Sequence, residues 1–327
     1  MKIVVTGASG FIGREIVTEL RSKNHEIISF VGLKLKDLSE FKSFVRVDVT
    51  DFDSLSSNCE NQTADVVIHS AGLAHQFGKT PDEDFLKVNV KGTENIARLS
   101  VRLGVKHLIL ISSVAVYGNT GASGVIDEAN SCNPKGIYAK SKFEAEKIAT
   151  KICEEHKIAL TILRLATVIG ENDRGNTARL IEAIDKRRFL WIGKGENRKS
   201  LIYKNDVAKA CLQVLEKKTS ANEIFNVTGE DLKMSFIVSE IARNLKRKIL
   251  PFRISQSLLN VIFGVNKKSL NIGKISNLQE TVGKWISNDV FSGELFREKY
   301  GFQAETKISE AIRRQTQFYK QNLKTER

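Results

Sequence analysis

The stretch MKIVVTGASGFIG, residues 1–13, decides the fold predicted for this chain. It opens with an apolar, β-branched run at residues 2–6, which is typical of a buried parallel strand. Glycines and then apolar residues at helical spacing follow. Strand, glycine turn and helix in this order predict the phosphate-binding corner of a dinucleotide fold, because the turn brings backbone N–H groups at a helix N-terminus close to a diphosphate. The residues predicted to line this corner are Gly7, Ser9, Gly10, Phe11, Ile12 and Gly13.

The bulk composition is that of a folded protein with a large core. The chain has 327 residues, of which 41% are hydrophobic and 27% charged, so one large α/β domain, with or without an appendage, is expected. Met1 leads directly into the first strand, which leaves no room for a signal peptide, and no apolar run approaches the roughly 20 residues of a membrane span. The four cysteines are scattered without metal-ligand spacing. A cytoplasmic protein without a structural metal is therefore expected.

The charge is unevenly distributed. Residues 1–170 contain 21 basic and 20 acidic side chains, whereas residues 171–327 contain 30 basic and 18 acidic ones. The basic half would suit an anionic partner such as a diphosphate-bearing substrate or a membrane surface, although a generally lysine-rich composition would also explain it. The sequence shows no helix-turn-helix, zinc-finger or aromatic RNA-binding motif, so nucleic acid is not an expected partner.

Apolar runs and helical patterns continue to alternate along the chain. This alternation predicts an α/β fold with a Rossmann-type doubly wound parallel sheet. Residues 1–170 would form the dinucleotide-binding domain together with a returning segment near 201–228. The rest of 171–327 would form a smaller, mixed α/β substrate-binding cap. The further predicted strands lie at 26–31, 44–47, 65–69, 107–113 and 161–165, and a long helix is predicted at 82–103.

The end of the second predicted strand bears on the choice of cofactor. Dinucleotide folds that prefer NAD usually place an acidic residue there to bind the ribose hydroxyls. Here the strand ends at Val31 and Gly32, and Lys34 and Lys36 follow. Because no carboxylate would repel the 2′-phosphate of NADP, and the lysines could attract it, NADP is favoured over NAD. The lysines could equally belong to a solvated loop.

Polar and small residues end the third and fourth strands. The Asp48 carboxylate could accept a hydrogen bond from an adenine amino group while Val49 packs on the ring, or Asp48 could cap the next helix. His69 is interpreted as a packed, hydrogen-bonded side chain. Ala71 and Gly72 follow it and permit the close approach of a cofactor.

Tyr138 and Lys142 lie four residues apart at the start of a predicted helix, so both project from one face. A nearby ammonium favours the phenolate and would lower the tyrosine pKa from about 10 toward neutrality. Ser113 ends the fifth strand and could hold a substrate alcohol or carbonyl beside the tyrosine. These three residues are the predicted catalytic set, a proton relay for hydride transfer with nicotinamide. A chance pair on a surface helix is the alternative, which the position after a serine-ended strand disfavours.

In order and spacing, these motifs resemble those of the extended short-chain dehydrogenases/reductases, in the NAD-dependent epimerase/dehydratase group that acts on nucleotide sugars. The resemblance implies that Asn89, Tyr138, Lys142 and Leu165 also contact NAD or NADP. It further implies that Ser113, four residues before a Tyr-Gly pair, is the catalytic serine, and that the protein pairs as a homodimer. The matching segments are 6–13, 48–49, 69–72, 89–93, 112–118, 138–142 and 164–170.

Two departures from the family pattern bear on the activity. Leu165 stands where the family has proline, which affects the contacts expected at the nicotinamide amide. Sugar 4,6-dehydratases carry Asp-Glu directly after the catalytic hydroxyl residue, whereas Val114 and Ala115 stand here. Neither side chain can act as an acid or a base, which argues against dehydration.

The second half of the chain resembles sugar-nucleotide 4-ketoreductases and 4-epimerases of surface-polysaccharide pathways. By that resemblance Asn176, Arg179 and Arg198 would approach the nucleotide diphosphate, a role that suits the planar guanidinium. Each arginine could instead form a surface ion pair. Basic residues flank a short apolar run at 258–263, which could dock on a membrane surface, although a packed cap helix is favoured.

The function predicted from the sequence is NAD(P)-dependent hydride transfer at C4 of a UDP- or dTDP-hexose, for the synthesis of surface-polysaccharide sugars. A 4-ketoreductase would consume NAD(P)H, whereas a 4-epimerase would oxidise and re-reduce the sugar with tightly held NAD. The missing acidic residue on the second strand favours the reductase. The alternatives are a dehydrogenase of a sterol-like or other apolar alcohol, and a non-catalytic NAD(P)-sensing protein.

Overall fold

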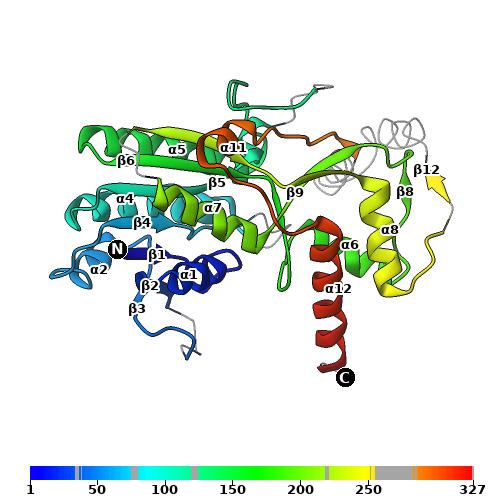
Figure 1. The fold of residues 1–327 in the computed structure, drawn as a ribbon, viewed down its shortest axis with the longest axis horizontal. Helices are drawn as coiled ribbons and strands as arrows, with labels where there is room; N and C mark the ends of the chain where they lie inside the picture. The colour runs from blue at the N-terminus through cyan, green and yellow to red at the C-terminus, as the bar shows by residue number, and fades with distance from the viewer. Residues whose placement is uncertain are drawn as a thin grey trace.

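The computed structural model of the chain describes residues 1–33, 37, 39–74, 80–118, 124–217, 221–250, 252–254, 283 and 286–325. Its centre is a seven-stranded sheet in the order β10-β6-β5-β4-β1-β2-β3, with every neighbouring pair parallel (Figure 1). This confirms the predicted doubly wound parallel sheet. The strands are β1 (Lys2–Thr6), β2 (Glu26–Gly32), β3 (Phe44–Val47), β4 (Val66–His69), β5 (His107–Ser113), β6 (Ala159–Leu165) and β10 (Glu223–Val227).

Helices cover both faces of this sheet because its inner strands, such as β1, β4, β5 and β6, are buried on both sides. On one face Val17, Val207 and Phe296 pack into a shared core with the strands. On the other face Leu55 and Ile96 do the same. The first face carries α1 (Gly13–Ser22), α7 (Lys204–Glu216) and α11 (Glu294–Tyr300), and the second carries α2 (Phe52–Ser57), α4 (Gly92–Arg102) and α5 (Gly136–Glu155).

The long helix predicted at 82–103 is helical over its whole length but not uniform. It consists of α3 (Asp82–Phe85), a π-helical stretch at Leu86–Lys91 and then α4. Asn89 lies in the π-helical stretch and is buried. Wider turns of this kind are often found at functional sites.

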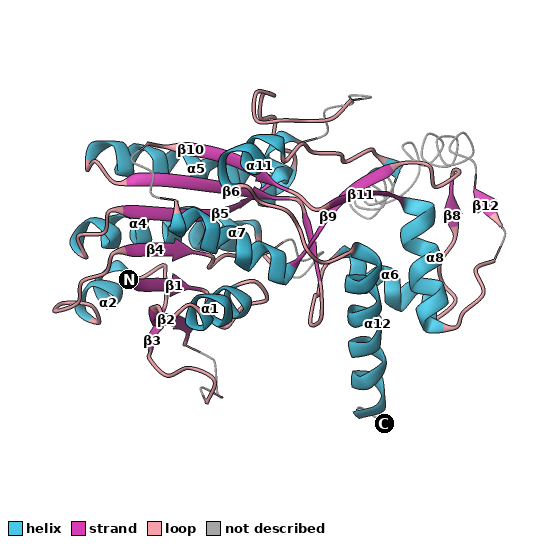
Figure 2. Cartoon of the chain, in the orientation of Figure 1, coloured by secondary structure: helices cyan, strands magenta, loops and turns pink. Residues whose placement is uncertain are grey.

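The second part of the molecule is small and mixed, as predicted. A three-stranded sheet and a two-stranded pair lie beside three helices, whose apolar faces share a separate core that includes Ile181, Ile241 and Ile312 (Figure 2). The strands are β7 (Thr167–Ile169), β8 (Trp191–Ile192), β9 (Arg198–Tyr203), β11 (Glu230–Lys233) and β12 (Arg253–Ile254), and the helices are α6 (Asn176–Asp185), α8 (Met234–Leu245) and α12 (Ile308–Thr325).

The division of the chain between the two parts differs in detail from the expected one. The chain returns to the large sheet with α7 and β10, but β9 belongs to the three-stranded sheet. Helix α11, expected in the cap, packs on the large sheet, because the rings of Phe296 and Tyr300 meet the ring of Phe225 of β10 edge to face. Lys34, Lys36 and the apolar run at 258–263 lie outside the described residues. Among the described helices, none is both long and apolar enough to cross a membrane.

Candidate active site

The glycine corner connects β1 to α1 through a turn that only small residues can form. Gly7 has φ +65°, and a Cβ built on it would lie 2.7 Å from the backbone nitrogen of Ala71. A Cβ on Gly13 would lie 2.1 Å from the Gly7 carbonyl oxygen, so α1 starts in direct contact with the turn. The N-cap residue of α1, Ile12, has no capping side chain. Because no side chain caps the helix, N–H groups of its first turn can bind an anion.

The loop after β4 borders this corner and is held in place by hydrogen bonds with buried side chains. The Thr6 hydroxyl accepts a hydrogen bond from the Ala71 N–H at 3.1 Å and contacts His69 Nδ1 at 2.6 Å. His69 Nε2 lies 3.0 Å from the Thr93 hydroxyl, and burial, together with the Lys142 ammonium, lowers the pKa of His69 to about 3. The ring is neutral and structural, which confirms the interpretation from sequence.

Asn89 fixes the position of the same loop. Its Oδ1 accepts a hydrogen bond from the Leu73 N–H at 2.7 Å, and its Nδ2 donates to the Leu73 carbonyl and to the Ser141 hydroxyl. Gly72 lies against it, since a Cβ there would be 3.0 Å from Asn89 Oδ1 and 3.4 Å from Lys142 Nζ. The structure thus places Asn89 as the link between the loop and α5, and its predicted contact with a cofactor stays a prediction.

The two serines at the end of β5 face opposite sides, as neighbouring residues of a strand must. Ser112 is buried and donates a hydrogen bond to Glu146. Ser113 is partly exposed, and its hydroxyl is hydrogen-bonded to the phenol of Tyr138. Of the two, Ser113 is therefore the serine that meets the tyrosine.

Tyr138 and Lys142 lie in the first two turns of α5. Each residue as a whole is partly exposed, whereas the phenol group and the ammonium group at the ends of the side chains are buried. Lys142 Nζ donates to the Ile111 carbonyl at 2.9 Å. Burial of the ammonium group lowers the pKa of Lys142 to about 8, although the carboxylate of Glu146 opposes the shift. Burial raises the pKa of Tyr138, and the hydrogen bond from Ser113 opposes that rise. The prediction that Lys142 lowers the pKa of Tyr138 is therefore wrong, because loss of water around the phenol outweighs the groups that favour phenolate.

A buried ionic network next to the predicted catalytic residues was not predicted from the sequence. The Arg164 guanidinium forms hydrogen bonds with both oxygens of Glu146, with Nη2 at 2.7 Å from Oε2, and donates to the Tyr117 hydroxyl at 3.0 Å. The side chains of Arg164 and Glu146 are 5% and 4% exposed, so the pair is deeply buried. Because Glu146 also accepts a hydrogen bond from Ser112, the network ties β5, β6 and α5 together next to the predicted catalytic residues.

The other predicted cofactor residues border the same edge of the sheet. Asp48 accepts hydrogen bonds from the N–H and hydroxyl of Thr50 at 2.9 and 2.7 Å, and Asp51, not Asp48, caps α2. Val49 packs against Gly92 at the start of α4, where an added Cβ would lie 2.9 Å from Val49 Cγ2. Leu165 is buried at the end of β6, opposite Ser113 in the sheet register.

The predicted substrate residues lie on two elements of the cap. Asn176 and Arg179 are exposed in the first turn of α6. Arg198 is exposed at the start of β9 and donates to the Asp231 carbonyl at 2.9 Å. The loop before α6 is supported by α12, since Gln315 donates to Asp173 at 3.0 Å.

These features fit a nicotinamide dinucleotide. The turn has no room for side chains at Gly7 and Gly13, so its backbone can approach a diphosphate, and the N-terminus of α1 faces it. The Ser113–Tyr138 pair lies along the same edge, at the carboxyl ends of the strands, where open α/β sheets bind ligands. A hydroxyl pair with a neighbouring ammonium can move a proton to or from a substrate alcohol.

Comparisons with known proteins agree with this geometry. The N-acetyl-α-D-glucosaminyl-diphospho-ditrans,octacis-undecaprenol 4-epimerase of Escherichia coli O157:H7 is 28% identical over 254 residues, covering 76% of this chain and 73% of that protein. The UDP-glucose 4-epimerase of Vibrio cholerae is 28% identical over 246 residues, covering 73% and 74%. The solved structure titled MoeE5 in complex with UDP-glucose and NAD has the same fold, with a TM-score of 0.76 and 22% identity over 99% of this chain and 100% of that one.

The family model supports the same assignment over a larger share of the sequence than the motifs alone. Residues 3–228, more than half of the chain, match the model described as the NAD dependent epimerase/dehydratase family. This span contains the glycine corner, Ser113, Tyr138 and Lys142. The chain therefore belongs to the NAD dependent epimerase/dehydratase family of extended short-chain dehydrogenases/reductases.

Proposed function

We propose that this protein transfers hydride at C4 of a nucleotide-linked hexose, a UDP- or dTDP-sugar. The observation that carries the proposal is the hydrogen-bonded pair of Ser113 and Tyr138, beside the buried ammonium of Lys142, on the same sheet edge as the glycine corner. The choice of C4 is supported by the two relatives, since both are named 4-epimerases.

Each catalytic residue has a role that follows from its position. The Tyr138 phenol would take the proton of the sugar hydroxyl when the sugar is oxidised and return it when the ketone is reduced. The Ser113 hydroxyl would hold the same oxygen, and the Lys142 ammonium, which donates to the Ile111 carbonyl, would place a positive charge near the reacting groups. NAD or NADP, when bound, supplies the acceptor and donor of the hydride. Gly7, Gly13 and the first turn of α1 would bind its diphosphate.

The same chemistry could serve a 4-epimerase or a 4-ketoreductase, and a different observation supports each. The names of the relatives favour a 4-epimerase, which returns the hydride and consumes no cofactor. The end of β2 favours NADP and hence a 4-ketoreductase: Gly32 is surrounded by open space, and Arg46 donates to the Leu33 carbonyl beside it. The 2′-phosphate of NADP would find a cation there and no carboxylate at the end of the strand, which closes with Val31 and Gly32.

The contacts with the nucleotide diphosphate are also proposed. Asn176, Arg179 and Arg198 are exposed side chains of the cap, and a guanidinium can hold two phosphate oxygens at once. The E. coli relative and the V. cholerae relative both act, by their names, on sugars carried by a diphosphate. We also propose that the protein forms a homodimer, which light scattering can test. With this function go a cytoplasmic location and a part in surface-polysaccharide synthesis.

A paired assay tests the proposal. The protein is incubated with UDP-glucose or UDP-galactose without added cofactor, and sugars are separated by chromatography. In parallel it is incubated with NADPH or NADH and a UDP-4-keto-6-deoxyhexose, and absorbance at 340 nm is followed. Interconversion without net cofactor use identifies a 4-epimerase, whereas stoichiometric oxidation of the cofactor identifies a 4-ketoreductase. Tyr138→Phe is expected to abolish either activity while the dinucleotide Kd stays within about threefold.

Other results would overturn the proposal. Turnover of a steroid alcohol, without turnover of any nucleotide sugar, would establish the apolar-alcohol alternative. Dinucleotide binding without turnover of either substrate class, with cellular function unchanged by Tyr138→Phe, would establish the sensing alternative.

A further inference from the structure

The feature that leads beyond this function is Lys204, the first residue of α7, which the sequence motifs did not single out. Its side chain runs over Gly170, where an added Cβ would lie 2.9 Å from both Cγ and Cδ of the lysine. A side chain at position 170 would therefore displace it. The glycine thus makes room for the lysine to extend from α7 toward α1.

The Lys204 ammonium ends between two carboxylates beside the glycine corner. Nζ lies 2.8 Å from Glu15 Oε1 and 3.6 Å from Glu171 Oε2. It also lies 5.9 Å from the centroid of the Phe11 ring, in the predicted phosphate-binding turn. The exposed fractions of the three charged side chains are 13%, 18% and 27%, so water and salt screen them less than they would an exposed surface pair.

The two carboxylates create an electrostatic problem at this position. Glu15 is in the first turn of α1, the helix end at which a diphosphate would bind. A carboxylate there is compatible with the helix dipole, but it would repel the negative charges of a diphosphate. Two such carboxylates without a counter-ion would weaken the binding of any anion at this corner.

We infer that Lys204 is a positioning residue of the cofactor corner, whose ammonium offsets one of the two negative charges of Glu15 and Glu171 so that a dinucleotide diphosphate can bind at the N-terminus of α1. The inference rests on the proposed placement of the dinucleotide at this corner. Lys204 acts through Glu15 and Glu171 and not by contact with the substrate.

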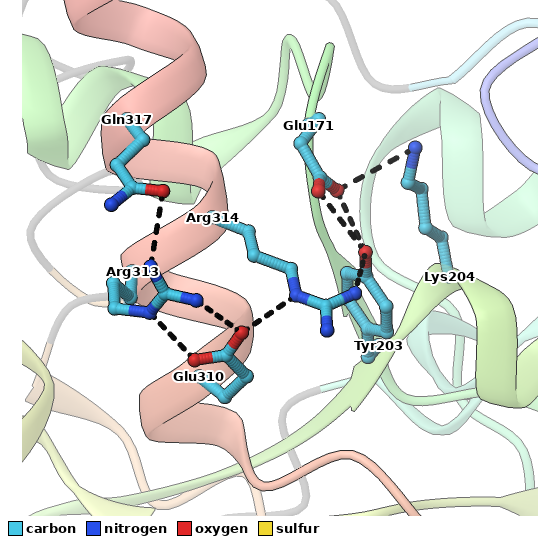
Figure 3. A network of polar contacts seen from close by, with 7 residues as sticks. All are labelled: Glu171, Tyr203, Lys204, Glu310, Arg313, Arg314 and Gln317. Carbon is cyan, nitrogen blue, oxygen red and sulfur yellow. Dashed lines mark hydrogen bonds and ion pairs between the residues drawn. The ribbon is translucent and has the colours of Figure 1, made fainter.

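The cap holds Glu171 in place for this interaction, as Figure 3 shows. The Tyr203 hydroxyl donates to Glu171 Oε2 at 2.8 Å, and Arg314 of α12 donates to the same hydroxyl at 3.4 Å. Burial raises the pKa of Tyr203 to about 12, so the phenol keeps the proton that it donates. Glu310 in turn bonds both Arg314 and Arg313. A chain of charged side chains, linked through the neutral Tyr203 phenol, thus runs from α12 to the first turn of α1.

The test measures dinucleotide affinity and does not depend on turnover. Kd values for NADH and NADPH are determined by protein fluorescence for the wild type, Lys204→Met, Glu15→Gln and the double variant Lys204→Met/Glu15→Gln, at low and high salt. Lys209→Met is the matched control, because Lys209 is also on α7 and pairs with Glu305. Urea unfolding of each variant accompanies the binding curves.

Lys204→Met is expected to raise the Kd about tenfold at low salt and by less at high salt, because it removes the cation that Glu15 and Glu171 share near the diphosphate. The double variant is expected to recover most of the affinity, because it removes one of those carboxylates. Lys209→Met is expected to bind like the wild type.

Three results separate failure of the inference from failure of the proposed function. An unchanged Kd in Lys204→Met would refute the inference. A weakened Kd that Glu15→Gln does not restore would also refute it, because the loss would then be structural and not one of charge. A wild-type protein that binds neither dinucleotide would refute the proposed function itself.

Discussion

The buried ammonium of Lys142 should make the stability of the protein depend on pH in a way that one substitution removes. The pKa of Lys142 is lowered from 10.5 to about 8 in the folded protein, chiefly by burial. Between these values the unfolded chain binds a proton that the folded protein does not, so the free energy of unfolding rises with pH across that window. Below about pH 8 both states carry the charge, and the full cost of burying it remains.

The size of the effect follows from the two pKa values. A displacement from 10.5 to about 8 corresponds to roughly 3 kcal/mol of destabilisation at neutral pH. Linkage places about 2 kcal/mol of this between pH 7 and pH 9.5. Lys142→Met removes the titrating group, so the stability advantage of this variant over the wild type should shrink by about 2 kcal/mol over that interval.

Urea unfolding followed by circular dichroism at pH 7.0, 8.0, 9.0 and 9.5 measures this difference. Other groups that titrate in this range contribute equally to both proteins and cancel in the comparison. Lys140→Met is the control, because Lys140 is exposed on the same helix and should reproduce the wild-type pH dependence. If wild type and Lys142→Met have parallel stability curves between pH 7 and pH 9.5, the ammonium is not desolvated as described.

Three further outcomes are expected. Ser113→Ala should lower kcat about 100-fold without changing dinucleotide affinity. Ser112→Ala should mainly lower the free energy of unfolding, by about 1–2 kcal/mol. Equal losses of kcat in the two variants would contradict the opposite orientations of these serines. Gly13→Ala should abolish dinucleotide binding and lower the free energy of unfolding by about 3 kcal/mol or more. Gly32→Ala, where the added methyl group would point into open space, should be nearly neutral. Similar calorimetric melting temperatures for the two variants would argue against the close turn. The His69 ring, with its pKa lowered to about 3, should give no NMR titration between pH 5 and 8, and a midpoint near 6.5 would show that it is solvated.

Local patterns were enough to predict the large sheet, and they also select Ser113, Tyr138 and Lys142, whose catalytic role stays a prediction. Apolar, β-branched runs such as residues 2–6 alternate with helical patterns, and parallel strands bring their carboxyl ends to one edge. The spacing of Tyr138 and Lys142 is itself a helical repeat, so the sequence shows directly that they share a face. The choice of Ser113 over Ser112 also follows from a local rule, the alternation of side chains along a strand.

The contacts that sequence reasoning missed join residues far apart in the chain. Lys204 and Glu15 lie on different helices, and Arg164 meets Glu146 across a strand and a helix. No periodicity reports such pairs, because each partner alone resembles an ordinary surface charge. The predicted direction of the Tyr138 pKa shift is wrong for a related reason. The neighbouring ammonium can be read from the sequence, whereas burial of the phenol, which depends on the whole fold, has the larger effect on the pKa.

The support of the loop before α6 by α12 bears on the order in which the protein becomes functional during synthesis. Gln315 contacts Asp173 across 142 positions of sequence. A growing chain on the ribosome could fold its first strands and the glycine corner well before α12 emerges. The loop that leads to Asn176 would lack this support until then, so the sugar-nucleotide contact proposed for Asn176 would be among the last properties that a nascent molecule acquires.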